Sequence, residues 1–214
     1  HDIDAGYDTK TGPSDRSGLR VFYAGMLEET KGLGDAFEAV AHLSSQGGAA
    51  RLSVAGTGDE AAWKARAEAL GIGSSVTFLG MVPHAAVLEH MHAHDAVLVP
   101  SRWDYAEGLP NVLCEALAAR TPLVISDHPA FASRLVNEQD CLIFPAGNSM
   151  ALAKALQQLA EDTVLFKNLS ENSAAAFRNV QFGLYWDQLW TLFLEDPGSK
   201  TGWVQKNSLA ALRV

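Results

Sequence analysis

The sequence predicts a doubly wound, Rossmann-like α/β protein, built on a parallel sheet of about six strands with helices on both faces. Two observations support this prediction. Short, continuously apolar runs such as LRVFYAG and DAVLVPS are typical of strands that are buried on both faces of a sheet. Segments with apolar residues at helical spacing separate these runs, and this alternation is typical of parallel strands joined by right-handed helical crossovers.

The expected elements follow one another along the chain. Apolar runs predict strands at 19–25, 50–56, 75–80, 95–101, 122–126 and 141–144. A helical apolar face predicts a first helix at 34–47, which Gly47 and Gly48 end, and Gly71 ends a second helix at 61–71. Further helices are expected at 83–93, 110–119, 151–162, 164–179 and 184–196.

Composition excludes several classes of function. A formal net charge of -9 argues against a nucleic-acid partner and against electrostatic binding to a membrane. The two cysteines, Cys114 and Cys141, form no CxxC or CxxH motif, so neither a zinc site nor a disulfide framework is expected. No apolar run reaches the roughly 18 residues of a membrane span. We therefore expect a cytoplasmic protein with no metal and no transmembrane segment.

Three regions are expected. Residues 1–17 are polar and predict a linker or N-terminal extension, so that the chain is expected to begin within a longer protein. Residues 18–196 predict one globular domain with its C-terminal helices. Residues 197–214 predict a polar tail that carries a single tryptophan, Trp203.

The segment EGLPNVLCEALA places one acid before an expected helix and another inside it. Pro110 suits the first helical position, because its missing N–H would have no partner there. Gly108 lets a ligand approach the backbone closely. Helix N-termini bind anions readily, and the N–H groups that converge here belong to Gly108, Leu109, Asn111 and Val112.

Glu107 and Glu115 lie on either side of this helix start. Their carboxylates would repel a diphosphate, but they can accept hydrogen bonds from hydroxyl groups on either side of one. A sugar on one side and a ribose on the other would use both acids, which is the chemistry of a nucleotide-sugar. The alternative stays open that Glu107 is a solvated loop acid and that Glu115 is only favoured there by the helix dipole.

Other loops at the carboxyl ends of the strands give weaker signals. Lys31, in AGMLEETKG, lies where an ammonium can reach a phosphate, although the pattern alone favours a surface lysine in a turn. The glycines of GTGDE (56–60) are equally explained by tight turning. The backbone of FLGMVPH (78–84) is expected to line a base pocket. The tract HMHAHD (90–95) favours an ordinary polar face over a metal site, and Asp127-His128 are interpreted as loop residues.

Together these motifs resemble the C-terminal, donor-binding half of glycosyltransferase family 4 (group 1) enzymes, which have the GT-B fold. The likeness covers about residues 18–195 and follows the family's order. Its most specific part is the run Glu-Gly-Leu-Pro-Asn-Val-Leu-x-Glu-Ala after a VPS strand. The other matching segments are AGMLEETKG, LSVAGTGDE, VTFLGMVP and CLIFPAGN.

The resemblance implies metal-independent transfer of a hexose, with retention, from a nucleotide-diphospho-sugar that is a substrate rather than a cofactor. It implies that Glu107 holds hydroxyls of the donor sugar, Glu115 those of the ribose, and Lys31 the phosphate charge. Glu107 and Lys31 are the implied catalytic residues, and whether Glu107 orients the sugar or attacks it stays open. The implied donor-binding set is Gly25, Met26, Lys31, Met81, Val82, Glu107, Gly108, Leu109, Pro110, Asn111, Val112 and Glu115.

Two departures from the family pattern matter. Met26 stands where the family usually has an arginine, so one cation for the diphosphate is missing. Either another cation replaces it, for which Arg102 is our candidate, or the donor differs, or activity is weak. The family's N-terminal, acceptor-binding domain is not in these residues, so this chain alone is expected to be an inactive half. That domain is the expected partner, and through it the enzyme is expected to lie against the inner face of the membrane.

Two rival hypotheses follow from the same residues. A sugar-nucleotide epimerase shares the two-domain architecture, but it would need acid/base residues beside a sugar carbon. A nucleotide-binding or partner-binding module that has lost catalysis is the non-enzyme alternative, and Met26 is the feature that favours it.

Overall fold

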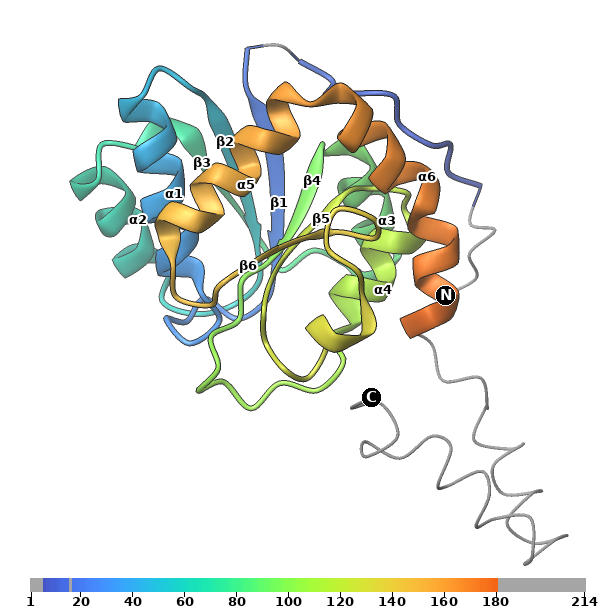
Figure 1. Ribbon diagram of the computed structural model, residues 1–214. Helices are drawn as coiled ribbons and strands as arrows, with labels where there is room; N and C mark the ends of the chain where they lie inside the picture. The colour runs from blue at the N-terminus through green and yellow to red at the C-terminus, as the bar shows by residue number, and fades with distance from the viewer. Residues whose placement is uncertain (1–5, 16, 181–214) are drawn as a thin grey trace, which may run out of the picture. The chain divides into compact units, whose positions relative to one another are not determined.

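The structure is a computed structural model that describes residues 6–15 and 17–180 (Figure 1). Its six strands form one parallel sheet in the order β3-β2-β1-β4-β5-β6. The predicted fold class is therefore confirmed. The strands are β1 (Leu19–Ala24), β2 (Ala50–Ala55), β3 (Val76–Gly80), β4 (Ala96–Val99), β5 (Leu123–Ser126) and β6 (Leu142–Phe144).

Six α-helices of the described residues cover this sheet (Figure 1). Two short 3₁₀ turns lie at Gly73–Ser75 and Ala132–Arg134. The helices are α1 (Leu33–Ser45), α2 (Glu60–Ala69), α3 (His84–Ala93), α4 (Asn111–Ala118), α5 (Ser149–Glu161) and α6 (Thr163–Val180). The helix expected at 184–196 and the tail at 197–214 lie outside the described residues.

The sheet separates two hydrophobic cores, because alternate side chains of a strand point to opposite faces. Val21 and Tyr23 of β1 pack with residues of α1 and α5, whereas Phe22 packs with residues of α4 and α6. Both faces of β1 and β4 are thus buried. This explains why their sequences are continuously apolar instead of alternating with polar residues.

Main-chain hydrogen bonds join the loops that follow the first three strands. The N–H of Gly25 donates to the carbonyl of Ala55 at 3.0 Å, and that of Leu27 donates to Thr57 at 2.9 Å. The N–H of Gly56 donates to the carbonyl of Gly80 at 2.8 Å. The loops at the carboxyl ends of β1, β2 and β3 are therefore hydrogen-bonded to one another through their main chains.

Part of the segment predicted as a linker lies against the domain. The main-chain N–H of Lys10 donates to the Ser170 hydroxyl at 2.8 Å, and its ammonium donates to the carbonyl of His92 at 2.7 Å. The N–H of Ser14 donates to the buried carboxylate of Asp95 at 2.8 Å. Burial lowers the pKa of the Lys10 ammonium to about 8.

None of the helices in the described part of the chain is long and apolar enough to cross a membrane.

Candidate functional site at the sheet switch point

The strand order reverses between β1 and β4, which are neighbours in the middle of the sheet. The chain leaves β1 toward α1 on one face and leaves β4 toward α4 on the other, and a small crevice between the two loops is lined by Lys31, Ser101 and Pro110 among others. These two loops carry Lys31 and Glu107, which are 76 residues apart in sequence. The structure brings both to the crevice, where the ammonium of Lys31 lies 2.6 Å from Oε2 of Glu107.

The two loops approach each other closely at Gly32. This residue has a φ of 74°, and a Cβ atom there would lie 2.0 Å from the carbonyl oxygen of Pro100. The main-chain N–H of Arg102 also donates to the carbonyl of Thr30 at 2.8 Å. Glycine at position 32 is therefore required for the loop after β1 to lie against the loop after β4.

The carboxylate of Glu107 is largely enclosed, since its side chain is 10% exposed. Its Oε2 atom accepts hydrogen bonds from Lys31 and from the hydroxyl of Ser101, the latter at 2.8 Å. The ammonium of Lys31 lies 4.3 Å from the centre of the Tyr105 ring, within the range of a cation–π contact. Glu107 is thus not the solvated loop acid of the alternative interpretation.

Helix α4 begins beside this pair. Pro110 is its N-cap, with φ −71° and ψ 133°, and makes no side-chain cap bond. The prediction that Pro110 takes the first helical position is wrong by one residue, because its ψ keeps it extended and its carbonyl accepts the N–H of Leu113. The first helical residues are Asn111 and Val112, whose N–H groups have no acceptor within the helix.

A depression of about 320 Å³ lies next to the crevice, over the joined loops of β1, β2 and β3. Four residues of the predicted donor-binding set share it, namely Gly25, Met26, Met81 and Val82. Met26 and Met81 are 47% and 76% exposed, which is unusual for such apolar side chains. The remaining lining residues are Ala24, Ala55, Gly56, Thr57 and Val87, so the wall is mainly apolar.

Glu115 lies in the second turn of α4 and is 5% exposed. Its Oε1 atom lies 3.4 Å from Nδ1 of His84, the first residue of α3. Burial raises the pKa of the Glu115 carboxyl above 4.5, and the charge of His84 acts in the opposite direction. The burial of this acid destabilises the folded state at pH values where the carboxyl is charged.

Replacing Glu115 by glutamine is expected to stabilise the domain at neutral pH. Well below pH 4.5 the wild-type carboxyl is protonated in both states, so the two proteins should differ little. As the pH rises, the carboxyl ionises first in the unfolded chain, because its pKa is higher in the folded state. The wild type therefore loses stability relative to Glu115→Gln. Urea unfolding at about pH 3.5 and about pH 8 measures this; a less stable variant at pH 8 would contradict it.

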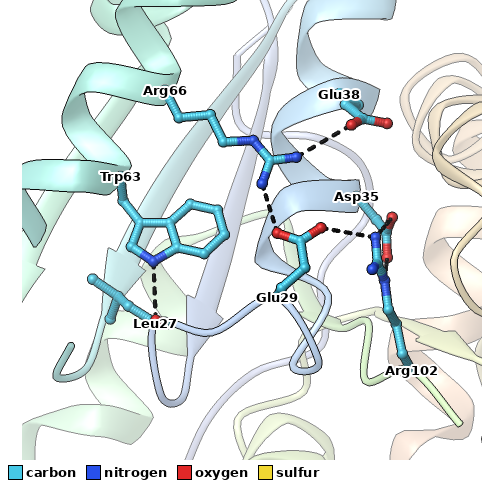
Figure 2. Close-up of polar contacts among 7 residues, drawn as sticks. All are labelled: Leu27, Glu29, Asp35, Glu38, Trp63, Arg66 and Arg102. Carbon is cyan, nitrogen blue, oxygen red and sulfur yellow. Dashed lines mark hydrogen bonds and ion pairs between the residues drawn. The ribbon is translucent and has the colours of Figure 1, made fainter. Parts of the chain in front are cut away.

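Arg102 does not replace the missing cation, which corrects our expectation. Figure 2 shows its guanidinium turned to α1, where Nε and Nη2 donate to both oxygens of Asp35 at 2.8 and 2.7 Å. Nη2 also lies 2.9 Å from Glu29. Asp35 is 2% exposed, and the planar guanidinium of Arg102 neutralises its charge by contacting both carboxylate oxygens. Arg102 therefore fixes the loop that carries Glu107 instead of facing the crevice.

The same network continues toward α2. Arg66 contacts Glu29 at 2.6 Å and Glu38 at 3.2 Å (Figure 2). The indole N–H of Trp63 donates to the carbonyl of Leu27 at 2.9 Å. Charged side chains from the loop after β1, from α1 and from α2 are thus tied to the loop after β4.

Some motifs have structural roles. Gly58, in GTGDE, has a φ of 153°, and a Cβ there would lie 2.7 Å from the Cβ of Leu27, so close packing of loops explains it. His94 is bound through Nε2 to the Ser53 hydroxyl at 2.8 Å. His128 bonds the carbonyl of Tyr105 through Nε2 at 3.1 Å, so it supports the loop after β4. Residues 6–15 and 17–180 contain no group of three or more potential metal ligands.

The residues that sequence reasoning missed are Ser101, Tyr105 and Asp35. Ser101 and Tyr105 lie in the SRWDYAEG loop, and their position between β4 and Glu107 was an available signal. Asp35 lies in the first turn of α1, where acids are common, so its sequence position gives no signal. Only the fold shows that it faces Arg102.

The chain is similar to a known protein family. The model of the family described as glycosyl transferases group 1 matches residues 10–176. The chain belongs to this family.

Two curated relatives show how much of such a protein is present. The chain is 31% identical over 188 residues to a phosphatidyl-myo-inositol mannosyltransferase of Mycobacterium leprae, with 86% of this chain and 49% of that protein covered. It is 32% identical over 147 residues to the amylovoran biosynthesis glycosyltransferase AmsK of Erwinia amylovora, with 67% and 36% covered. The chain thus spans half or less of the length of these relatives.

Solved structures share the fold. The C-terminal domain of a group 1 glycosyl transferase, LpcC of Francisella tularensis, matches with a TM-score of 0.68 at 18% identity, covering 84% of this chain and 97% of that one. The Anabaena protein Alr3699/HepE, solved in complex with UDP-glucose, matches with a TM-score of 0.68 at 22% identity, covering 83% and 50%. The described fold is that of the C-terminal domain of a GT-B glycosyltransferase.

Proposed function

We propose that this chain is the donor-binding half of a retaining glycosyltransferase, and that it binds a nucleotide-diphospho-sugar in the crevice between β1 and β4. The observation that carries the proposal is the meeting of Lys31, Glu107 and the start of α4 at the switch point of the sheet. A cation and a helix N-terminus suit a diphosphate. An enclosed carboxylate beside them suits hydroxyl groups.

Each part of the ligand has a complementary surface. The apolar depression beside Met26 and Met81 would take the base, with the neighbouring main chain at Val82. Glu115 would accept hydrogen bonds from the ribose hydroxyls, and Glu107 from those of the sugar. The N–H groups of Gly108, Leu109, Asn111 and Val112 would face the diphosphate and the sugar. The Anabaena neighbour in complex with UDP-glucose supports a ligand of this class.

The chemistry follows from this placement. In transfer, the bond between the sugar and the diphosphate breaks, and negative charge gathers on the leaving diphosphate. Lys31 and the N-terminus of α4 would stabilise that charge, and because these groups are fixed beforehand they need no reorganisation. We assign to Glu107 the orientation of the sugar.

The acceptor would come from a further domain, since the chain spans only part of its relatives. Metal independence and retention are part of the proposal. The first predicts that donor binding is the same with magnesium and with a chelator. The second predicts, for the longer enzyme, a product with the anomeric configuration of the donor, as measured by NMR.

A nucleotide-binding module without transfer activity is the second candidate. Two features favour this candidate: Met26 stands in place of the family's arginine, and Arg102 is paired with Asp35. Lys31 is then the cation that we place on the diphosphate. Transfer of sugar by the longer protein would exclude this candidate.

Calorimetric titration of the chain with UDP, GDP and ADP, and with sugars linked to each, tests the proposal. One nucleotide should bind in preference to the others, and its sugar-linked form should bind at least as tightly. Absence of binding by every nucleotide, both to this chain and to the longer protein, would overturn it.

Replacing Gly108 by alanine is expected to weaken donor binding about tenfold and to leave stability almost unchanged. A Cβ there has no described protein atom within 4 Å, so the fold should accept it with a change of less than about 1 kcal/mol. The methyl group would stand where we place the ligand against the backbone. Calorimetry and urea unfolding of the same sample measure both effects. Unchanged donor affinity would remove Gly108 from the site.

A further inference from the structure

The ion pair between Lys31 and Glu107 joins two groups that the proposed function gives to different parts of one ligand. Nζ of Lys31 lies 2.6 Å from Oε2 of Glu107, and their side chains are 16% and 10% exposed. The hydroxyl of Ser101 donates to the same oxygen. In the structure, the groups that we assign to phosphate and to sugar therefore satisfy each other.

A ligand that ends at the diphosphate replaces only one of these partners. Its phosphate oxygens would draw Lys31 away, and Glu107 would keep the Ser101 hydroxyl but lose its cation. An enclosed carboxylate that loses its cation and gains a negative neighbour is unfavourable. A diphosphate that continues into a hydroxylated sugar replaces both partners, because phosphate takes Lys31 and sugar hydroxyls take Glu107.

Residues of the loop after β4 contact the Lys31 side of the pair. The ring of Tyr105 lies 4.3 Å from the ammonium of Lys31, and the N–H of Arg102 binds the carbonyl of Thr30, next to Lys31 in the chain. The guanidinium of Arg102 is anchored in turn to Asp35 (Figure 2). The two loops that carry the pair are therefore joined to each other by contacts outside the pair itself.

We propose that the Lys31–Glu107 pair makes the site discriminate between an intact nucleotide-sugar and the nucleoside diphosphate that remains after transfer. The donor gives a new partner to both Lys31 and Glu107. The product, a nucleoside diphosphate, gives a new partner to Lys31 alone. Glu107 is thus a specificity-determining residue that weakens product binding. This inference rests on the proposed function.

The test is Glu107→Gln, which removes the charge and keeps the shape of the side chain. The chain is titrated with UDP and UDP-glucose, and with GDP and GDP-mannose, and the pair that binds the wild type is used. The variant should bind the bare diphosphate roughly threefold to tenfold more tightly, because Lys31 is no longer held. Its preference for the sugar-linked form over the bare diphosphate should shrink by at least that factor.

Two controls separate the exchange from a general charge effect. Asp104 is exposed on the same loop, so Asp104→Asn removes an equal charge and should leave the preference unchanged. In a Lys31→Met background, Glu107→Gln should give a smaller gain in diphosphate affinity, because it then removes only the repulsion between carboxylate and phosphate.

Three results would overturn the inference. The first is unchanged or weaker diphosphate binding by Glu107→Gln, in a chain that still binds nucleotide. The second is an equal gain in Asp104→Asn, and the third is an equal gain in the Lys31→Met background. Absence of nucleotide binding by the wild type is distinguishable from these, since it overturns the proposed function itself.

Discussion

Replacing Gly56 by alanine is expected to lower the free energy of unfolding by roughly 3–5 kcal/mol. Gly56 has a φ of 145°, and a Cβ atom there would lie 1.7 Å from the carbonyl oxygen of Gly25. The main-chain N–H of Gly25 also donates a hydrogen bond to the carbonyl of Ala55, so this backbone has little room to move. The variant must separate the loops after β1 and β2, and with them the depression that Gly56 lines.

Gly71→Ala is the matched control for this prediction. Gly71 also has a positive φ, 72°, but no described atom lies within 4 Å of the added Cβ. Its cost should therefore be limited to backbone strain, about 1 kcal/mol. Urea unfolding of the two variants measures the difference; equal losses in both would show that the close approach of the loops adds nothing.

Replacing Arg102 by alanine is expected to lower the free energy of unfolding by about 2–3 kcal/mol. The change leaves the carboxylate of Asp35, which is 2% exposed, without its cation. A fully buried pair broken in this way costs about 3–5 kcal/mol, and solvent reduces this because Arg102 is 31% exposed. The hydrogen bonds to Asp35 raise the already high pKa of Arg102, so the guanidinium is charged at every working pH.

Arg66→Ala provides the control within the same network (Figure 2). Its partners Glu29 and Glu38 are 44% and 47% exposed, so the loss should stay below about 1 kcal/mol. Arg102→Lys should fall between the two, because an ammonium keeps the charge but cannot form the two-pronged contact with Asp35. Equal destabilisation by Arg102→Ala and Arg66→Ala would contradict the role of the buried pair.

The fold could be predicted because a parallel sheet that is covered on both faces requires a recognisable pattern of apolar residues in the sequence. Each strand must be apolar on both sides, as at Val21, Phe22 and Tyr23, and helices must intervene. Loops at the carboxyl ends follow from that order, so Lys31 and Glu107 could be placed at one edge. Boundaries were less predictable, since one dihedral angle decides whether Pro110 lies inside α4 or caps it.

Pairing of side chains across distant loops could not be predicted. Arg102 and Asp35 are 67 residues apart, and nothing in the local pattern of either names the other. From the sequence Arg102 was a free cation near a phosphate; the fold directs it to a buried acid. The ion pair between Lys31 and Glu107 was hidden for the same reason, although both residues were in the predicted site.

The central claim, that ligand binds at the switch point of the sheet, is tested most directly by mapping amide shifts. The ¹⁵N-labelled chain is titrated with the nucleotide-sugar that calorimetry selects. We expect shifts in the amides of Lys31, Gly108, Asn111 and Val112 and in the loop at 80–84. Two further depressions lie at the opposite edge of the sheet, and both are lined by Leu19, Gly47, Gly48 and Ala49 among others. Shifts confined to that edge would contradict the account.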